Sequence, residues 1–168
     1  FTLQNTADAV KQYKTDRDPA EKLFSFKRCI VHFAVDDNEI MMCTELKKDD
    51  SYFMPFNKGF EDGAGNPPNP NGIKTDYLWK DILTKREFSK ILENYVQIVA
   101  DKDEDTGKTS YKQIFPRYHQ LKAVTMLLDR AKKEGAGQRY LIQHSAGSGK
   151  SNSIAWLAHQ LVTLQNGG

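Results

Sequence analysis

RYLIQHSAGSGKSNSIAWLAHQL, residues 139–161, runs from a short apolar segment through a glycine-rich turn into a longer apolar segment. The apolar run at 140–142 is typical of a buried parallel strand. The two glycines of the turn allow backbone N–H groups to approach an anion closely. A helix that begins near Lys150 directs the positive end of its dipole at the same point. The stretch therefore predicts a strand, a phosphate-binding loop and a helix, in that order.

The predicted loop follows the pattern G-x-x-x-x-G-K-[ST] except at its first position, where His144 replaces a small residue. In this pattern the lysine, here Lys150, reaches the β- and γ-phosphates of a nucleotide, and the hydroxyl of Ser151 binds Mg²⁺. The alternative interpretation is an ordinary glycine turn that joins a strand to a helix. The apolar segments on both sides favour the phosphate-binding loop.

Composition limits the class of protein. The chain has 168 residues, of which 39% are hydrophobic, so it can bury one core or two small ones. A net charge of +2 does not by itself indicate a nucleic-acid surface. Cys29 and Cys43 lie in apolar runs, which favours buried free thiols in a reducing cytosol over a disulfide or a metal site. Without an apolar run of transmembrane length or a signal-peptide pattern, we expect a cytoplasmic protein that has no membrane partner.

The N-terminal third predicts a helix followed by a small sheet. Residues 5–18 predict a helix whose N-cap is Asn5 or Thr6. Two β-type runs flank the turn residues 36–38, which predicts a hairpin that continues into a further extended segment.

The middle of the chain predicts a loop, two helices and a linker. Residues 61–72 are rich in proline, glycine and asparagine and predict a surface loop. Residues 75–100 predict two consecutive helices, and a capping box from Thr84 to Glu87 starts the second one. The charged and small residues 101–110 predict a linker between two domains.

The last part of the chain predicts a helix before the strand and the loop. Pro116 suits the first turn of this helix, and Gly135 suits its end. The apolar side chains that share one helical face are Leu121, Val124, Leu127 and Leu128. A helix, a strand, a phosphate loop and a helix are the beginning of a RecA-like motor domain. Such a domain needs further βα units and a second acidic motif, so we expect these residues to belong to a longer polypeptide.

Several short stretches carry a resemblance to one enzyme family. They are QYKTDRDP, HFAVDD, FMPFNKG, GAGNPPNP, YLW and FPRYHQ, followed by residues 139–161. In this order they resemble the restriction (R) subunit of type I restriction–modification enzymes. In that family a PD-(D/E)xK-type nuclease domain precedes a superfamily 2 translocase of two RecA-like domains. The subunit uses ATP to translocate duplex DNA and cleaves it far from the recognition site.

The resemblance implies an α/β fold with two parts. Residues 1–100 would be the C-terminal half of the nuclease domain, residues 101–110 a linker, and residues 111–168 the first strand–P-loop–helix unit of the motor domain. The protein would act as part of an ATP-dependent type I site-specific deoxyribonuclease, with modification (methyltransferase) and specificity subunits as partners. The stretch of 168 residues alone is expected to be inactive.

The resemblance also implies residues that bind ATP and Mg²⁺. Gln120 lies where superfamily 2 proteins place a glutamine that hydrogen-bonds the adenine edge, and Arg117 lies one helical turn before it. The alternative is that both are ordinary exposed helix residues. His119 and His159 are expected to be packed or solvated. The predicted set is Arg117, Gln120, Ala146, Gly147, Ser148, Gly149, Lys150 and Ser151, the last also being the Mg²⁺ ligand.

A second acidic pattern imitates a nuclease centre. Glu45 and Lys47, with Asp36 before them, match the loose Asp…Glu-x-Lys pattern and would share one face of a strand. In the family this motif precedes the Gln-Tyr-Lys helix, so we expect the catalytic carboxylates upstream of Phe1 and none within this stretch. We interpret residues 45–50 as a solvated strand end. The candidates for a helper role in the nuclease are Gln12, Tyr13 and Lys14.

Two other classes of function stay open from the sequence. One is a standalone P-loop nucleotide-binding module, such as a small kinase. The other is a non-catalytic assembly or DNA-docking domain. A gene product near 19.2 kDa would favour a standalone module, and a much longer one the restriction subunit.

Overall fold

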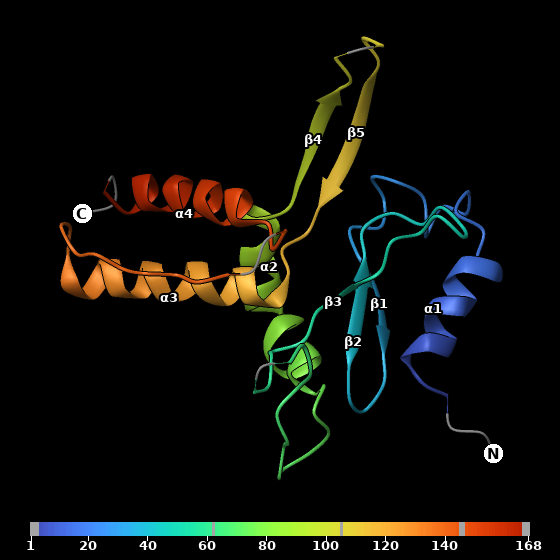
Figure 1. Cartoon of the computed structure of the whole chain (residues 1–168), viewed down its shortest axis with the longest axis horizontal. Helices are drawn as coiled ribbons and strands as arrows, with labels where there is room; N and C mark the ends of the chain where they lie inside the picture. The colour runs from blue at the N-terminus through green and yellow to red at the C-terminus, as the bar shows by residue number, and fades with distance from the viewer. Residues whose placement is uncertain (1–3, 62, 105, 145–146, 166–168) are drawn as a thin grey trace. The chain divides into compact units, whose positions relative to one another are not determined.

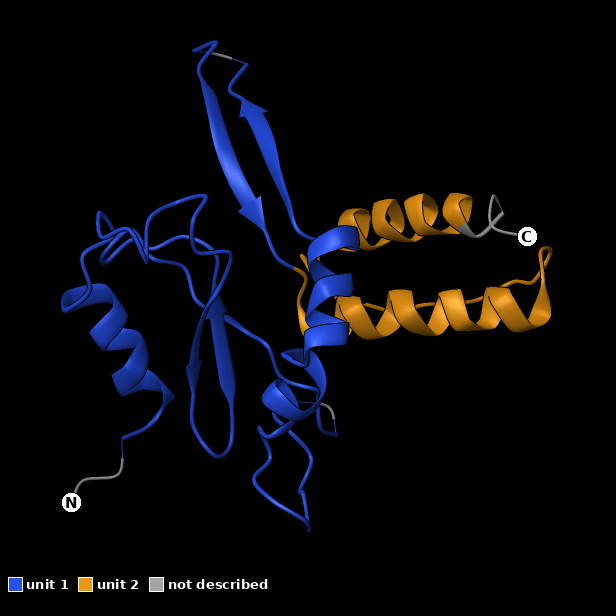
Figure 2. Ribbon diagram, turned by 180° about the vertical axis from the view of Figure 1, so that it is seen from behind, with its two compact units in different colours: residues 1–115 blue, residues 116–168 orange. Residues whose placement is uncertain are grey.

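The computed structural model describes residues 4–61, 63–104, 106–144 and 147–165, and the chain divides into two compact units (Figure 2). Unit 1 is Phe1–Phe115 and unit 2 is Pro116–Gly168. The fold is mixed, with helices and small antiparallel sheets, which agrees with the general α/β class predicted from the sequence. Within the described ranges, no helix is long and apolar enough to cross a bilayer.

A three-stranded antiparallel sheet lies in unit 1, in the order β1-β2-β3 (Figure 1). The strands β1 (His32–Val35) and β2 (Ile40–Cys43) form the predicted hairpin, and β3 (Met54–Pro55) is the further extended segment. One face of the hairpin is buried, as alternation requires. The buried apolar side chains from this region are Ala34, Ile40, Met42, Cys43 and Phe56.

Helix α1 (Thr6–Thr15) begins as the sequence predicts. The side chain of Asn5 accepts a hydrogen bond from the backbone N–H of Asp8, and the Asp8 carboxylate accepts one from the N–H of Asn5. This reciprocal capping box satisfies two N–H groups that the helix itself cannot pair. The local sequence therefore sets the start of α1.

The carboxylate of Asp36 joins α1 to the β1–β2 turn. One oxygen accepts hydrogen bonds from the backbone N–H and the hydroxyl of Thr6, at 2.9 and 2.7 Å. The other accepts from the backbone N–H groups of Asn38 and Glu39, at 2.7 and 2.9 Å. Partial burial acts to raise the pKa of Asp36, but these hydrogen bonds outweigh it and lower the pKa from 3.8 to about 2. The turn and the helix are therefore held by one ionised side chain.

Replacing Asp36 by Asn should destabilise the chain by about 1–3 kcal/mol, because hydrogen bonds to a charged group are lost. The neighbouring exposed Asp37 provides the control, and Asp37→Asn should change stability little. Because the folded-state pKa of Asp36 is depressed, its contribution is present above pH 3.8 and is lost as the pH falls toward about 2. Urea unfolding at several pH values checks this. Equal stability of the two variants would contradict it.

The predicted pair of helices is present, but the second ends early. A π-helical turn, η1 (Leu78–Ile82), precedes α2 (Lys85–Asn94). The Thr84 side chain caps α2 by accepting a hydrogen bond from the N–H of Glu87. The expectation that helix continues to residue 100 is wrong, because the chain turns into a strand after Asn94.

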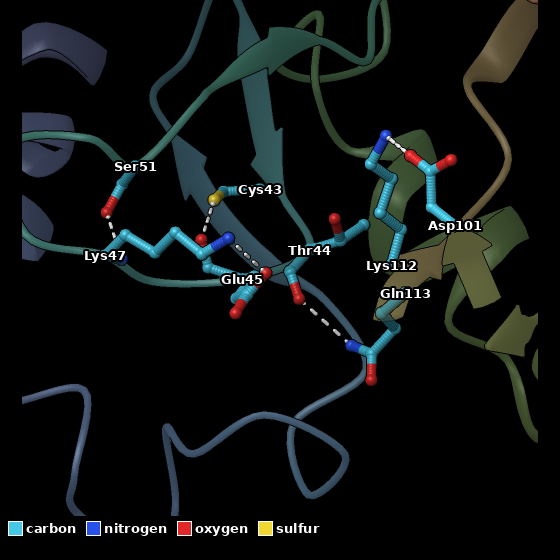
Figure 3. Close-up of polar contacts among 8 residues, drawn as sticks. All are labelled: Cys43, Thr44, Glu45, Lys47, Ser51, Asp101, Lys112 and Gln113. Atoms are coloured by element: carbon cyan, nitrogen blue, oxygen red, sulfur yellow. Dashed lines mark hydrogen bonds and ion pairs between the residues drawn. The ribbon is translucent and has the colours of Figure 1, made fainter. Parts of the chain in front are cut away.

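The predicted linker at 101–110 belongs to a second antiparallel sheet instead. β4 (Gln97–Lys102) pairs with β5 (Thr109–Ile114), and Gly107 turns between them with φ 67°. The side-chain amide of Gln113 donates to the carbonyls of Cys29, Ile30 and Thr44, which ties the hairpin to the rest of unit 1. Figure 3 shows the contact with Thr44. The division between the units therefore falls after Phe115. The nuclease-like and RecA-like assignments of the two parts stay predictions.

Unit 2 contains α3 (Tyr118–Glu134) and α4 (Lys150–Gln165). As predicted, Leu121, Val124 and Leu128 are buried on one face of α3, and Gly135 ends the helix with φ 75°. Pro116 lies just before the N-cap residue Arg117 rather than within the first turn. In Figure 1 the connection after α3 runs back along that helix, so α3 and α4 begin at the same end.

The prediction of a strand at 140–142 is wrong. These residues belong to no helix or strand, and their side chains are not buried: Leu141 is 94% exposed and Ile142 is 42% exposed. A parallel strand needs a neighbour that accepts and donates its hydrogen bonds. None of the described residues of unit 2 supplies one, so the local apolar pattern does not become a strand here.

Candidate phosphate-binding site

The predicted phosphate loop lies at the N-terminus of α4. Gly147 and Gly149 have φ values of 72° and 78°, a left-handed conformation that favours glycine. Ser148 lies between them and is buried. Lys150 and Ser151 are the first residues of α4, and both are exposed. Ala146, predicted as part of the site, lies outside the described residues.

Three side chains from the start of α3 bind three successive carbonyls of the loop. Arg117 Nη2 donates to the carbonyl of Gly147 at 2.8 Å. His119 Nε2 lies 3.0 Å from the carbonyl of Ser148, and Gln120 Nε2 donates to that of Gly149 at 2.9 Å. Residues about 30 positions apart in the sequence therefore fix the path of the loop.

This arrangement determines where the loop amides point. In a planar trans peptide, the C=O of one residue and the N–H of the next point in opposite directions, and every described peptide bond is trans. The carbonyls of residues 147–149 face α3, so the N–H groups of Ser148, Gly149 and Lys150 face the other way. Successive N–H groups on one side of a loop, at a helix N-terminus, are a recurrent anion-binding arrangement.

The side chain of Lys150 points back toward the first position of the motif. Its Nζ donates to the carbonyl of His144 at 3.2 Å, so the ammonium group lies back toward the residue at the first motif position. Ser151, the predicted Mg²⁺ ligand, is an exposed residue of the first turn of α4. The residues that the pattern assigns to phosphate and Mg²⁺ are therefore accessible at the helix start.

Gln120 is placed differently from the sequence prediction. Its Nε2 binds Gly149, its Oε1 accepts from the backbone N–H of Arg117 at 2.9 Å, and the residue is only 3% exposed. Both ends of the amide are thus engaged in holding the loop and the start of α3. The adenine contact of Gln120 and Arg117 stays a prediction, and the structure gives both side chains a different task.

His119, which the sequence predicts to be packed or solvated, contacts the loop in the structure. A carbonyl can only accept, so the ring must donate to Ser148 from Nε2. Its ring also meets that of His144 edge-on, with centroids 5.1 Å apart. Burial lowers the pKa of His119 below 6.5, and Arg117 and His144 lower it further, although the Ser148 hydrogen bond acts to raise it. At neutral pH the ring is therefore an uncharged donor.

A cavity of about 440 Å³ lies beside the loop within unit 2. This volume is in the range of small-molecule sites. Apolar side chains from α3, from the 138–144 segment and from α4 form most of its wall, and Lys150 and His144 also line it. The apolar residues are Ala123, Val124, Leu127, Tyr140, Ile142, Ile154 and Leu157.

In unit 1, the nuclease-helper candidates make structural contacts. The Tyr13 hydroxyl donates to the carbonyl of Phe33 at 3.3 Å, and Lys14 Nζ donates to the carbonyl of Asp49 at 3.0 Å. Gln12 and Tyr13 line one shared cavity. A helper role in catalysis stays a prediction for all three.

The carboxylates of the nuclease-like pattern, Glu45 and Asp36, also make structural contacts. Glu45 and Lys47 form an ion pair at 2.8 Å beyond the end of β2 (Figure 3). Glu45 lies in a bend and Lys47 in an isolated β-bridge with Asp49, so, contrary to the prediction, neither lies on one of the strands. The Asp36 carboxylate is occupied by α1 and the turn. Across the described ranges, no group of three or more His, Cys, Asp or Glu side chains is arranged to hold a metal ion.

Both cysteines are free thiols, as the sequence predicts. Cys43 is buried and Cys29 is half-buried, and burial raises the pKa of each thiol. A raised pKa keeps the sulfur protonated and weakly nucleophilic. The Sγ atom of Cys29 also lies 3.6 Å from Nδ1 of His32.

Comparison with known proteins gives no match. No protein-family model, no curated protein and no solved structure is significantly similar to this chain.

Gly149→Ala should destabilise unit 2 more than Gly137→Ala does. Both glycines have a positive φ, 78° and 95°, which strains an alanine. Only at Gly149 would the new methyl group overlap Gln120 Nε2, whereas nothing lies within 4 Å of one at Gly137. Urea unfolding of the two variants measures the difference. Equal losses would contradict the close approach of Gln120 to the loop.

Proposed function

We propose that this chain is part of the R subunit of a type I restriction–modification enzyme and carries the phosphate-binding loop of its ATP-driven motor. The observation that carries the proposal is the orientation of the loop, whose carbonyls are held by α3 so that its amides face the opposite side. The motifs quoted from the sequence supply the family. Duplex DNA and the modification and specificity subunits are the partners that this proposal includes, and the cytoplasm is the compartment.

The finer fold is part of the same proposal. Unit 2 would begin the first RecA-like domain, since it has a helix, an extended segment, a glycine loop and a second helix in the required order. Unit 1 would be the C-terminal half of the PD-(D/E)xK-type nuclease domain. The division after Phe115 lies close to the boundary that the resemblance implies.

The residues present fit ATP and Mg²⁺. The N–H groups of Ser148, Gly149 and Lys150 would hold phosphate oxygens, and the Lys150 ammonium group would neutralise the β- and γ-phosphates. The Ser151 hydroxyl would be a ligand of Mg²⁺. ATP supplies the phosphoryl transfer that drives translocation, and the part of this chain is to bind and orient its phosphates.

Lys150→Ala should weaken ATP binding by about tenfold or more, because a charge-assisted hydrogen bond to phosphate is lost. Isothermal titration of the chain with ATP and Mg²⁺ measures this. Lys122→Ala removes an exposed lysine from α3 and is the matched control. In the intact restriction complex, the same Lys150 change should abolish translocation and, with it, cleavage. Undiminished ATP binding by the Lys150 variant would refute the proposed site.

Glu45→Ala should leave DNA cleavage by the intact subunit nearly unchanged, because Glu45 is paired with Lys47 and Asp36 is occupied by α1. The control is Lys47→Ala, which removes the other half of the ion pair. A gel assay of linearised plasmid, with translocation measured in parallel, gives the readout. Loss of cleavage with intact translocation would place the nuclease centre here after all.

A further inference from the structure

We propose that His119 is a positioning residue for the phosphate loop, acting with Arg117 and Gln120 as a clamp on the loop carbonyls. The inference rests on the proposed function of the loop. It concerns a residue for which neither the sequence pattern nor the resemblance supplies a role. The clamp is defined as the three side chains that bind the carbonyls of residues 147–149.

The geometry of the clamp supports a role in orientation. Three different donor groups, from one turn at the start of α3, reach three successive carbonyls at 2.8–3.0 Å. Each contact fixes one peptide plane, and each plane carries one amide to the opposite side. The middle plane, between Ser148 and Gly149, is set by His119 alone among the clamp residues. Without its donor, this plane can rotate and take the Gly149 N–H out of line.

A substitution at His119 tests the orientation of the loop more selectively than a substitution at Arg117 or Gln120 does. Gln120 also binds the backbone N–H of Arg117, so replacing it would disturb the start of α3. Arg117 is the N-cap residue and adds positive charge near the anion. The hydrogen bond of the His119 ring goes to the loop, and the ring is uncharged at neutral pH. A change at this residue therefore acts through the orientation of the loop.

The clamp also accounts for the unusual residue at the first motif position. His144 stands where the pattern has a small residue, and its ring packs edge-on against His119, with an interplanar angle of 81°. This contact holds the His119 ring in the orientation that directs Nε2 to Ser148. The carbonyl of His144 meanwhile accepts from Lys150. The departure from the pattern thus has a structural purpose at the same loop.

If His119 positions the loop, its loss should weaken the binding of every ligand that has phosphates. A residue that contacts the adenine base would instead affect only ATP. ATP, GTP and inorganic pyrophosphate share the loop amides, so loss of the His119 donor should weaken all three by a similar factor. A residue that reads adenine would affect ATP and leave GTP and pyrophosphate unchanged. The three ligands therefore distinguish positioning of the loop from recognition of the base.

The test compares His119→Leu with His119→Gln in the full chain. The leucine has no donor, whereas the amide nitrogen of glutamine reaches the place of Nε2. Titration with ATP, GTP and pyrophosphate, each with Mg²⁺, should show about a 3- to 10-fold loss for the leucine variant with every ligand. The glutamine variant should stay within about twofold of the wild type. His159→Leu, at an exposed histidine of α4, is the control for losing an imidazole.

The other possible results of these titrations would reject either the clamp or the proposed function. Wild-type affinity of the leucine variant, with Lys150→Ala still impaired, would reject the clamp and leave the proposed function standing. A loss confined to ATP, or a glutamine variant as weak as the leucine variant, would also reject it. Binding that Lys150→Ala does not weaken would reject the proposed function itself. If the leucine variant fails to fold, His119→Asn replaces it, since its amide nitrogen is too short to reach Ser148 and it should bind as weakly.

Discussion

The hydrogen bond from Gln120 to Gly149 is the contact on which the arrangement of unit 2 depends. It fastens the first turn of α3 to the residue that precedes α4, and the same side chain accepts from the N–H of Arg117. The approach is so close that a side chain at position 149 would overlap the amide. A larger side chain at position 149 would therefore require the Gln120 amide to move. Together with Arg117 and His119, Gln120 holds the backbone of residues 147–149.

In unit 1, too, polar side chains join separate segments of the chain through hydrogen bonds to backbone groups. Asp36 joins a helix to a turn, and Gln113 joins the second hairpin to backbone carbonyls near the first sheet. Asn66, only 4% exposed, binds Asn38, Asn57 and Lys58 and so anchors the 61–72 loop. Buried polar groups are stable only when they are paired, so each of these side chains permits one local path of the chain.

The sequence correctly predicted the features that depend on residues close together in the chain. Caps at Asn5, Thr84 and Gly135 marked helix ends correctly, and the turn after β1 marked the hairpin. It misjudged 101–110 as a linker, because short, charged strands with exposed side chains have the composition of a linker, and it extended the preceding helix over 97–100, which belong to β4. It also expected a strand at 140–142, where apolarity was present but a pairing partner was not. The loop residues followed from the motif, whereas the task of His119 depends on a contact across 29 positions that local pattern does not contain.

The exposed run at 140–142 has a consequence for how the protein behaves in solution. Leu141 is almost fully exposed and lies between two helices, in a segment that belongs to no helix or strand. Apolar side chains that face water together are sites at which a second chain can pack. A net charge of only +2 offers little repulsion against such association. Tyr140, Leu141 and Ile142 therefore give this segment an apolar surface against which a second chain can pack.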